Sequence, residues 1–167
     1  MKQFFILITL VATILPACGN QKNKTNQIPE KTVTQTNISD SNTVEYLTKA
    51  SFLKKVWDFT QSPNEWKFLG TKPAIIDFYA DWCGPCRIAG PILEEVGNEL
   101  GGKIQIYKIN TDQERELAQV FGITGIPAFL YIPINGKPVM MSGIARSNDE
   151  TKQMFIDNIG KILQVKK

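Results

Sequence analysis

Hydrophobic residues along the chain fall into short runs whose internal spacing predicts the type of element that each run forms. Five of the runs have the length and pattern of β-strands. The clearest is 74–79, because a nearly continuous apolar run of six residues is typical of a strand buried inside a parallel sheet. The five predicted strands are 44–47, 74–79, 104–109, 128–132 and 139–142. The last two are predicted to pair as a hairpin through Asn135-Gly136.

Four further stretches place hydrophobic residues every three or four positions, which is the period of a helix with one buried face. The predicted helices are 48–59, 86–100, 114–121 and 149–163. Gly101-Gly102 is expected to end the second helix, and Ser147 or Asn148 is expected to cap the fourth. Because strands and helices alternate, their order predicts an α/β fold with a central sheet covered by helices on both faces.

The first residues have the pattern of a secretory signal. Met1-Lys2 is a short basic start, 4–15 is apolar apart from threonines, and Ala17 precedes Cys18. The apolar run is too short for a transmembrane helix, which needs about 20 residues. Residues 15–18 resemble the bacterial lipobox, which implies a lipoprotein signal peptide at 1–17 and a lipid on Cys18. Pro16 stands where the lipobox prefers a smaller residue, so ordinary signal cleavage is the alternative.

The segment that follows Cys18 differs in composition from the rest of the chain. It is rich in Asn, Gln, Thr and Lys, and its few hydrophobic residues follow neither a helix nor a strand period. We therefore predict that 18–40 consists of the lipidated cysteine and a flexible tether. Residues 41–167 are predicted to form one domain, which fits the usual domain size of about 100–150 residues. The expected location is the bacterial cell envelope, as a lipoprotein that faces the periplasm.

Composition and charge exclude several classes of function. The 19 basic and 16 acidic residues are interspersed and give a net charge of only +3, which is not the pattern of a nucleic-acid-binding protein. The chain has three cysteines and no histidine. The lack of histidine excludes a His-activated nucleophile and a His-ligated metal. We expect no metal and no other cofactor.

The chemistry is expected at Cys83 and Cys86, which follow the buried strand 74–79 and open the next helix. A helix start presents unsatisfied N–H groups and the positive end of the helix dipole, which lower the pKa of a cysteine there. The two-residue spacer lets Cys86 resolve a mixed disulfide formed at Cys83. We expect Cys83 at the exposed mouth of the helix and Cys86 one turn inside. The alternatives are a structural disulfide and half a zinc site, and the second lacks further ligands.

Several segments resemble the thioredoxin family. Residues 77–87 look like the family's active-site segment, 108–112 like the end of its next strand, and Gly125-Ile126-Pro127 like its cis-proline loop. With Gly143, the resemblance covers about residues 44–165. It implies the thioredoxin fold, with a central mixed sheet flanked by helices on both faces, and a thiol–disulfide oxidoreductase activity.

The resemblance also implies roles for individual residues. Asp77 would accept the proton of Cys86 as that thiol attacks, and burial in an apolar strand should raise its pKa. Lys108 would pair with Asp77, although a strand lysine that faces solvent is the other possibility. A merely structural Asp77 and an ordinary loop proline at Pro127 are the plain alternatives. Contacts to the substrate are implied for Trp82, Gly84, Pro85, Ile126, Pro127 and Gly143.

The expected function is therefore a protein-disulfide reductase of the cell envelope. Its expected partners are disulfide-containing client proteins, a membrane electron donor of thiol type, and the membrane itself through the lipid on Cys18. We expect a monomer that binds no nucleic acid. The Gly-Pro spacer resembles that of the reducing members of the family. An oxidase or isomerase of the same fold would use the same residues in reverse, and a Cu(I) carrier is a further alternative because two thiolates can hold that ion.

Overall fold

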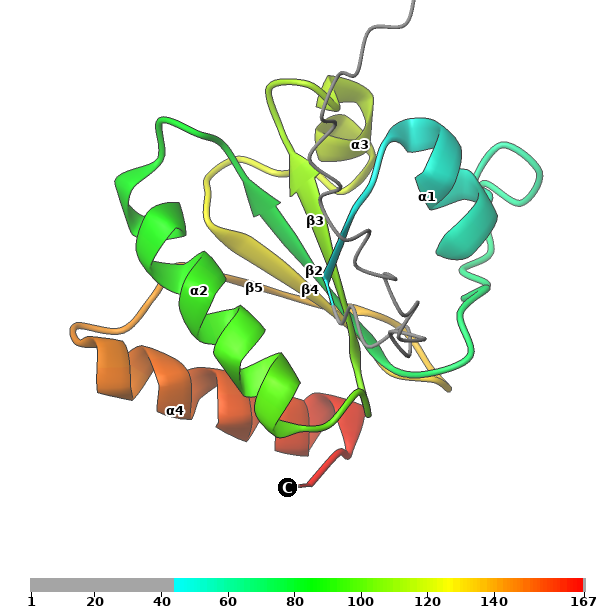
Figure 1. The fold of residues 1–167 in the computed structure, drawn as a ribbon. Helices are drawn as coiled ribbons and strands as arrows, with labels where there is room; N and C mark the ends of the chain where they lie inside the picture. Colours follow the sequence, from blue (N-terminus) through cyan, green and yellow to red (C-terminus); the bar gives the residue numbers. More distant parts are fainter. Residues whose placement is uncertain (1–43, 167) are drawn as a thin grey trace, which may run out of the picture. The chain divides into compact units, whose positions relative to one another are not determined.

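The computed structural model of the protein describes residues 44–166, so the predicted signal peptide, Cys18 and the predicted tether lie outside the described residues. Strands and helices alternate along this part of the chain, except that β4 is followed directly by β5 (Figure 1). The strands are β1 (Val44–Tyr46), β2 (Ala74–Tyr79), β3 (Gln105–Asn110), β4 (Ala128–Ile132) and β5 (Val139–Ser142). The helices are α1 (Lys49–Lys55), α2 (Gly84–Glu99), α3 (Arg115–Val120) and α4 (Asn148–Asn158), which continues into a π-helical turn, η1 (Ile159–Leu163).

The strands form one sheet in the order β1-β3-β2-β4-β5. β1, β3 and β2 run parallel, whereas β4 is antiparallel to β2 and β5 is antiparallel to β4. This is the mixed central sheet that the sequence predicts. We call the side where β2 and β3 end the carboxyl edge of the sheet, and the side where they begin the amino edge. The register places Asp77 of β2 beside Lys108 of β3.

Two hydrophobic layers cover the sheet, one on each face. Ile76 and Phe78 of β2 belong to the layer that contains Phe52 of α1 and Leu117 of α3. Ile75, which precedes Ile76, belongs to the opposite layer, which α2 and α4 cover. Figure 1 shows these two helices together on one side of the sheet. Because helices cover both faces, every residue of β4 and all but the last of β2 are buried.

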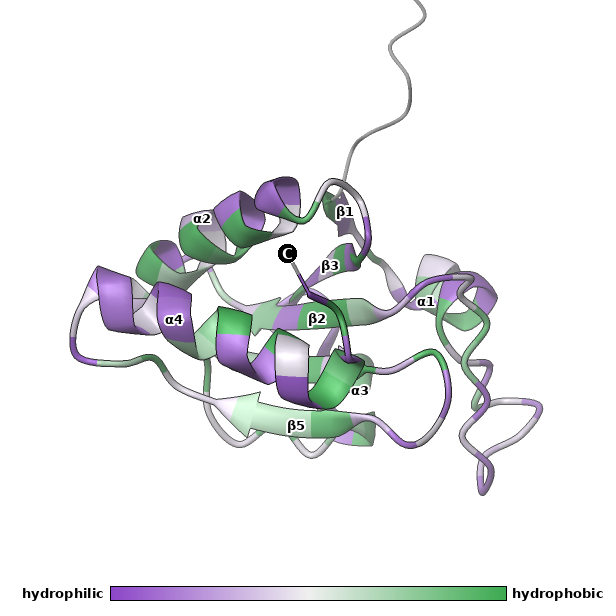
Figure 2. Ribbon diagram, turned by 90° about the horizontal axis from the view of Figure 1, so that it is seen from below, coloured by the Kyte–Doolittle hydropathy of each residue, from purple (hydrophilic) through white to green (hydrophobic). Residues whose placement is uncertain are grey.

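The hydropathy of the elements follows this arrangement. Figure 2 shows that α2 and α4 each carry both hydrophobic and hydrophilic residues, as helices with one buried side do. Phe155 of α4 is fully buried and packs edge-on against Phe129 of β4, with ring centroids 4.9 Å apart. The predictions of an α/β fold, a central mixed sheet and helices on both faces are therefore confirmed.

The first helix is shorter than the sequence predicts. It begins at Lys49, one residue after the predicted start, because reciprocal hydrogen bonds between Thr48 and Ser51 form a capping box at Thr48. It ends at Lys55, whereas the hydrophobic period predicts a helix to Phe59. A carboxylate oxygen of Asp58 accepts hydrogen bonds from the following backbone N–H groups, and this local turn competes with helical bonding. Phe59 still packs on the core, which is why the period misleads there.

Side-chain caps mark the starts of α2 and α4. α2 begins at Gly84, two residues before the predicted start, because Cys83 caps it and Pro85 is tolerated in the first turn. In α4, the side chain of Ser147 accepts from the backbone N–H of Glu150, and the Glu150 carboxylate accepts from Ser147 in return. Ser147, one of the two predicted candidates, is therefore the cap. Within residues 44–166 no helix has the length and apolarity needed to span a membrane.

Candidate active site

Cys83 and Cys86 lie at the amino end of α2, just beyond the carboxyl edge of the sheet. Cys83 is the N-cap residue, and the two sulfurs form a disulfide with an S–S distance of 2.08 Å. The backbone N–H of Cys86 donates to the Sγ atom of Cys83 at 3.2 Å. The sulfur of Cys83 thus lies where an α-helix best stabilises negative charge. After reduction, this position favours a thiolate on Cys83.

The cysteine pair is more buried than the sequence predicts. Only 3% of Cys83 and 5% of Cys86 is exposed, so the prediction that Cys83 lies at an exposed mouth is wrong for this disulfide form. The physical reason is a small apolar cluster in which Ala80, Tyr79 and Ile126 pack against the pair. Exposure does not distinguish the two sulfurs, but their positions on the helix do, because only Cys83 is the N-cap.

The loop before β4 contributes the second wall of the site. The peptide bond between Ile126 and Pro127 is cis, as predicted, and Pro127 is buried. The carbonyl oxygen of Pro127 accepts a hydrogen bond from the backbone N–H of Gly143 at 2.9 Å. Gly143 has a φ angle of 84°, in the region that favours glycine. The structure therefore brings Ile126 against the cysteine pair and ties Gly143 to Pro127.

Asp77 lies beneath α2. Its side chain is on the same face of the sheet as that of Ile75, because alternate residues of a strand share a face. A Cβ atom built on Gly90 of α2 would be 3.9 Å from the Oδ2 atom of Asp77. Gly90 is four residues after Cys86 and therefore on the same helix face. Asp77 thus faces the side of α2 that carries Cys86.

The environment of Asp77 favours its neutral form. The residue is 1% exposed, and its Oδ1 atom has no hydrogen-bond partner in the described part of the chain. Burial raises the pKa of Asp77 to about 7, Lys108 opposes this rise, and the charge of Glu94 adds to it. A carboxyl group with a pKa near 7 can accept and return a proton at neutral pH.

Lys108 is held by more groups than Asp77 alone. Its Nζ atom is 3.8 Å from the Oδ2 atom of Asp77 and 2.8 Å from a carboxylate oxygen of Glu94. The same ammonium lies over the rings of Tyr46 and Tyr79, 5.7 and 5.4 Å from their centroids. Burial lowers the pKa of Lys108, but the contacts with Glu94 and Asp77 outweigh this effect and raise it. Lys108 therefore stays charged between the acidic side chains of Asp77 and Glu94 and is not a free lysine facing solvent.

Two residues of this site, Glu94 and Tyr46, were not predicted from the sequence. Glu94 is one of two consecutive glutamates in α2, and only the packing of α2 on β3 shows which of them reaches Lys108. Tyr46 lies in the edge strand β1 and is largely exposed, so its hydropathy pattern carries no signal. For Glu94 alone the sequence carried a signal. Glu94 lies four residues after Gly90 and therefore shares its helix face.

Trp82 lies at the surface beside the cysteine pair, with 68% of the residue exposed. Its indole N–H donates to a carboxylate oxygen of Asp112 at 2.8 Å. The backbone N–H of Asp112 in turn donates to the side-chain oxygen of Asn110 at 3.0 Å. The loop after β3 therefore fixes an exposed aromatic ring next to Cys83. A fixed, exposed tryptophan is well suited to contact a protein substrate.

The site offers the groups needed for dithiol–disulfide exchange. Gly84 and Pro85 are the first two residues of α2 and separate the cysteines. Within residues 44–166, no group of three or more His, Cys, Asp or Glu side chains is placed to hold a metal ion. What the arrangement provides is a pair of sulfurs at a helix start, a buried carboxyl group below them and a flat aromatic ring beside them.

A redox-active pair placed in this way on a five-stranded mixed sheet defines a class of thiol–disulfide exchange domains. Comparison with known proteins names the family: residues 43–157 match the family described as Thioredoxin. The chain therefore belongs to the thioredoxin family, whose members are thiol–disulfide oxidoreductases. The sequence-based identification of the family and of this activity is confirmed.

Individual relatives agree with this assignment. The chain is 40% identical over 102 residues to Thioredoxin of Borreliella burgdorferi, a match that covers 61% of this chain and 86% of that protein. It is 48% identical over 67 residues to the chloroplastic Thioredoxin Y of Oryza sativa. That match covers 40% of this chain and 39% of the rice protein. Among solved structures, the thioredoxin of Malassezia sympodialis is 26% identical and superposes with a TM-score of 0.51, covering 68% of this chain and 91% of that one.

Proposed function

We propose that this protein reduces disulfide bonds of client proteins outside the cytoplasm, using Cys83 and Cys86. The observation that carries the proposal is the disulfide at the N-cap of α2, above a buried carboxyl group whose pKa is about 7. A helix start supplies the nucleophile, and the buried carboxyl group supplies a proton acceptor.

In the first step, the thiolate of reduced Cys83 attacks one sulfur of a client disulfide. A bond forms between Cys83 and the client, and the second client sulfur leaves as a thiolate that takes a proton from water. Trp82 and the Ile126-Pro127 loop border this attack, because the ring of Trp82 is exposed and Ile126 packs against the cysteine pair. Gly84, Pro85 and Gly143 complete the proposed docking surface.

In the second step, Cys86 resolves the mixed disulfide. Its thiol transfers a proton to Asp77, and the resulting thiolate attacks the Sγ atom of Cys83. The bond between Cys83 and the client breaks, so the client leaves with both sulfurs reduced and the protein keeps the disulfide. Two electrons have moved from the protein to the client, whose remaining sulfur leaves as a thiolate and takes the proton held by Asp77. A thiol donor at the membrane must reduce the disulfide again before the next cycle.

Trapping of clients tests the assignment of the two cysteines. In Cys86→Ser the nucleophile remains but the resolving thiol is missing, so clients should accumulate as covalent partners of the protein. In Cys83→Ser we expect almost no trapped client. Both variants should lose the reduction of insulin. The two variants differ in only one sulfur each, so each is the matched control of the other.

Covalent partners are detected on non-reducing gels after each variant is isolated from an envelope extract. Stronger trapping by Cys83→Ser would reverse the assigned roles. Equal trapping by both variants would contradict any difference in role between the two cysteines. No trapping by either would favour the Cu(I) carrier.

The direction of electron flow is tested separately by the reduction potential of the cysteine pair. It should be close to that of thioredoxin, about −270 mV, and well below that of oxidases of this fold, about −120 mV.

We further propose that a lipid on Cys18 anchors the protein to a bacterial membrane, with the domain on the periplasmic side. The support is in the sequence: a basic start, a short apolar run and the lipobox-like residues before Cys18. A lipid would also remove a reactive thiol that is otherwise exposed to oxidation.

Metabolic labelling with a fatty acid tests the anchor. The wild-type protein should carry the label, and Cys18→Ala should not. Cys86→Ser serves as the control, because it removes a cysteine that the proposal leaves unmodified and should be labelled like the wild type. Label that persists in Cys18→Ala would contradict lipidation at this position.

A further inference from the structure

A cleft of about 270 Å³ opens at the amino edge of the sheet. Its walls are the end of α1, the segment 69–72 that leads into β2, and the first residues of β3. Three lysines, Lys54, Lys55 and Lys72, and one leucine, Leu69, line it. We call these four residues the basic cleft. None of them belongs to the site at the cysteine pair.

The basic cleft lies at the opposite end of the sheet from the cysteine pair. β2 has six residues and connects the two, since Lys72 precedes its first residue and Cys83 follows its last. At about 3.3 Å per residue, the two sites are about 20 Å apart. β1 also enters the sheet at the amino edge, where Val44 pairs with Ile106 of β3. Val44, the first described residue, therefore lies at the same edge of the sheet as the basic cleft.

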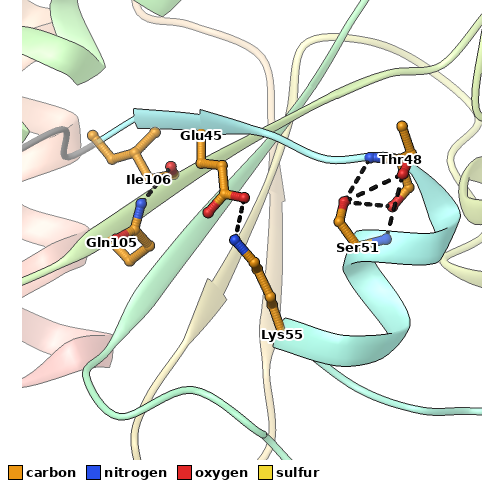
Figure 3. A network of polar contacts seen from close by, with 6 residues as sticks. All are labelled: Glu45, Thr48, Ser51, Lys55, Gln105 and Ile106. Atoms are coloured by element: carbon orange, nitrogen blue, oxygen red, sulfur yellow. Dashed lines mark hydrogen bonds and ion pairs between the residues drawn. The ribbon is translucent and has the colours of Figure 1, made fainter.

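The charge of the basic cleft is only partly neutralised. Figure 3 shows Lys55 reaching from α1 to Glu45 of β1, and this ion pair cancels one positive charge. Lys72 donates to the backbone carbonyl of Gly102, a neutral group that leaves the lysine charge in place. Lys54 is exposed, and no carboxylate partner for it lies in the described part of the chain. Two of the three positive charges are thus available to an external anion.

An exposed hydrophobic residue accompanies these charges. Leu69 is 42% exposed although it lines the same cleft. In the segment 66–69, Trp66 and Phe68 pack on the core, whereas Lys67 and Leu69 are exposed. This places one more lysine and the leucine on the outer side of the segment. Lysines that surround an exposed leucine are typical of surfaces that rest on anionic lipids.

We propose that the basic cleft rests on anionic phospholipid headgroups and so turns the cysteine pair away from the membrane. The proposal depends on the membrane anchor of the preceding section. A coil-like chain of the 26 residues from 18 to 43 would span about 25–30 Å, so an anchored domain stays within reach of the lipid surface. Weak contacts then suffice, because tethering keeps the local lipid concentration high. The cysteine pair, about 20 Å further out, would face clients in the aqueous phase.

The test uses the mature chain that begins at Cys18, anchored chemically. Two of the three cysteines form the disulfide, so Cys18 can be coupled selectively to a maleimide lipid in vesicles. Vesicles of phosphatidylcholine alone are compared with vesicles made of equal amounts of phosphatidylcholine and phosphatidylglycerol. Exposed lysines are then acetylated with a water-soluble reagent, and the rate at each lysine is measured by mass spectrometry.

We expect acetylation of Lys54 and Lys67 to slow at least about fivefold on the anionic vesicles, the effect of about one lysine–lipid contact. Acetylation of Lys49, which lies at the start of α1 towards the carboxyl edge, should not change. High salt should remove the protection, since it screens charges at a surface. In a double variant, Lys54→Gln with Lys67→Gln, anionic vesicles should no longer slow the acetylation of Lys72. The control double variant, Lys49→Gln with Arg146→Gln, also removes two positive charges. In this control the acetylation of Lys72 should still be slowed.

Equal rates on the two kinds of vesicle, or protection of Lys49 in place of Lys54, would overturn the proposal. Equal protection by soluble glycerol phosphate on neutral vesicles would also overturn it, because the cleft would then bind a small anion rather than a membrane. Since the coupling is chemical, the footprint does not depend on lipidation in the cell. A failure of fatty-acid labelling at Cys18 therefore remains distinguishable from a failure of this proposal.

Discussion

Replacing Asp77 by asparagine should stabilise the folded protein relative to the wild type, and increasingly so as the pH rises. The pKa of Asp77 is about 7 in the folded protein, compared with 3.8 for an unburied carboxyl group. The folded state therefore holds this proton more tightly than the unfolded chain does. The resulting contribution to stability is complete below pH 3.8 and is lost as the pH rises through about 7. An asparagine side chain does not titrate, so the variant keeps what the wild type loses.

The size of the effect follows from the two pKa values. They differ by about three pH units, and each unit corresponds to about 1.4 kcal/mol. The difference in unfolding free energy between Asp77→Asn and the wild type should therefore widen by up to about 4 kcal/mol between about pH 4 and pH 9. With a urea dependence of about 2 kcal/mol per molar, the two midpoints should move apart by about 2 M urea.

Urea unfolding of the disulfide form, followed by tryptophan fluorescence, measures this difference at several pH values. Asp157→Asn is the matched control, because it makes the same substitution at an exposed residue of α4, away from the cysteine site. A difference between Asp77→Asn and the wild type that stays constant across this pH range, or that has the opposite sign, would refute the reasoning. The same variant should reduce insulin more slowly near neutral pH, since Cys86 loses its proton acceptor.

Two further predictions concern neighbouring elements. Glu94→Gln removes a charge that raises the pKa of Asp77 and a carboxylate that holds Lys108, so the pKa of Asp77 should fall. The stabilisation by Asp77→Asn should then be smaller in the Glu94→Gln background than in the wild type. Ser147→Ala removes the cap of α4 and should lower the unfolding free energy by about 1 kcal/mol without changing insulin reduction, because Ser147 lies outside the cysteine site. An unchanged midpoint in urea would contradict the second prediction.

Residues close together in the sequence account for most of what could be predicted. The bounds of β2, β4 and β5 agree with the hydrophobic runs, because a strand buried on both faces, or paired in a hairpin, leaves a local pattern. The placement of Cys83 and Cys86 at a helix start was also predictable, since the motif follows a strand and precedes a helical period. The end of α1 was not, because residues beyond Lys55 pack on the same core without being helical.

The sequence by itself determined the fold class, the family and the pair of sulfurs that carries the chemistry, because each of these leaves a signature in neighbouring residues. Only the tertiary structure decided the surroundings of that pair. It showed that the disulfide is nearly buried, that Lys108 lies between Asp77 and Glu94, and that Asp112 holds Trp82. These contacts join residues from different strands, helices and loops. Their formation depends on sheet register and helix packing, and no local pattern of hydrophobic and polar residues encodes either.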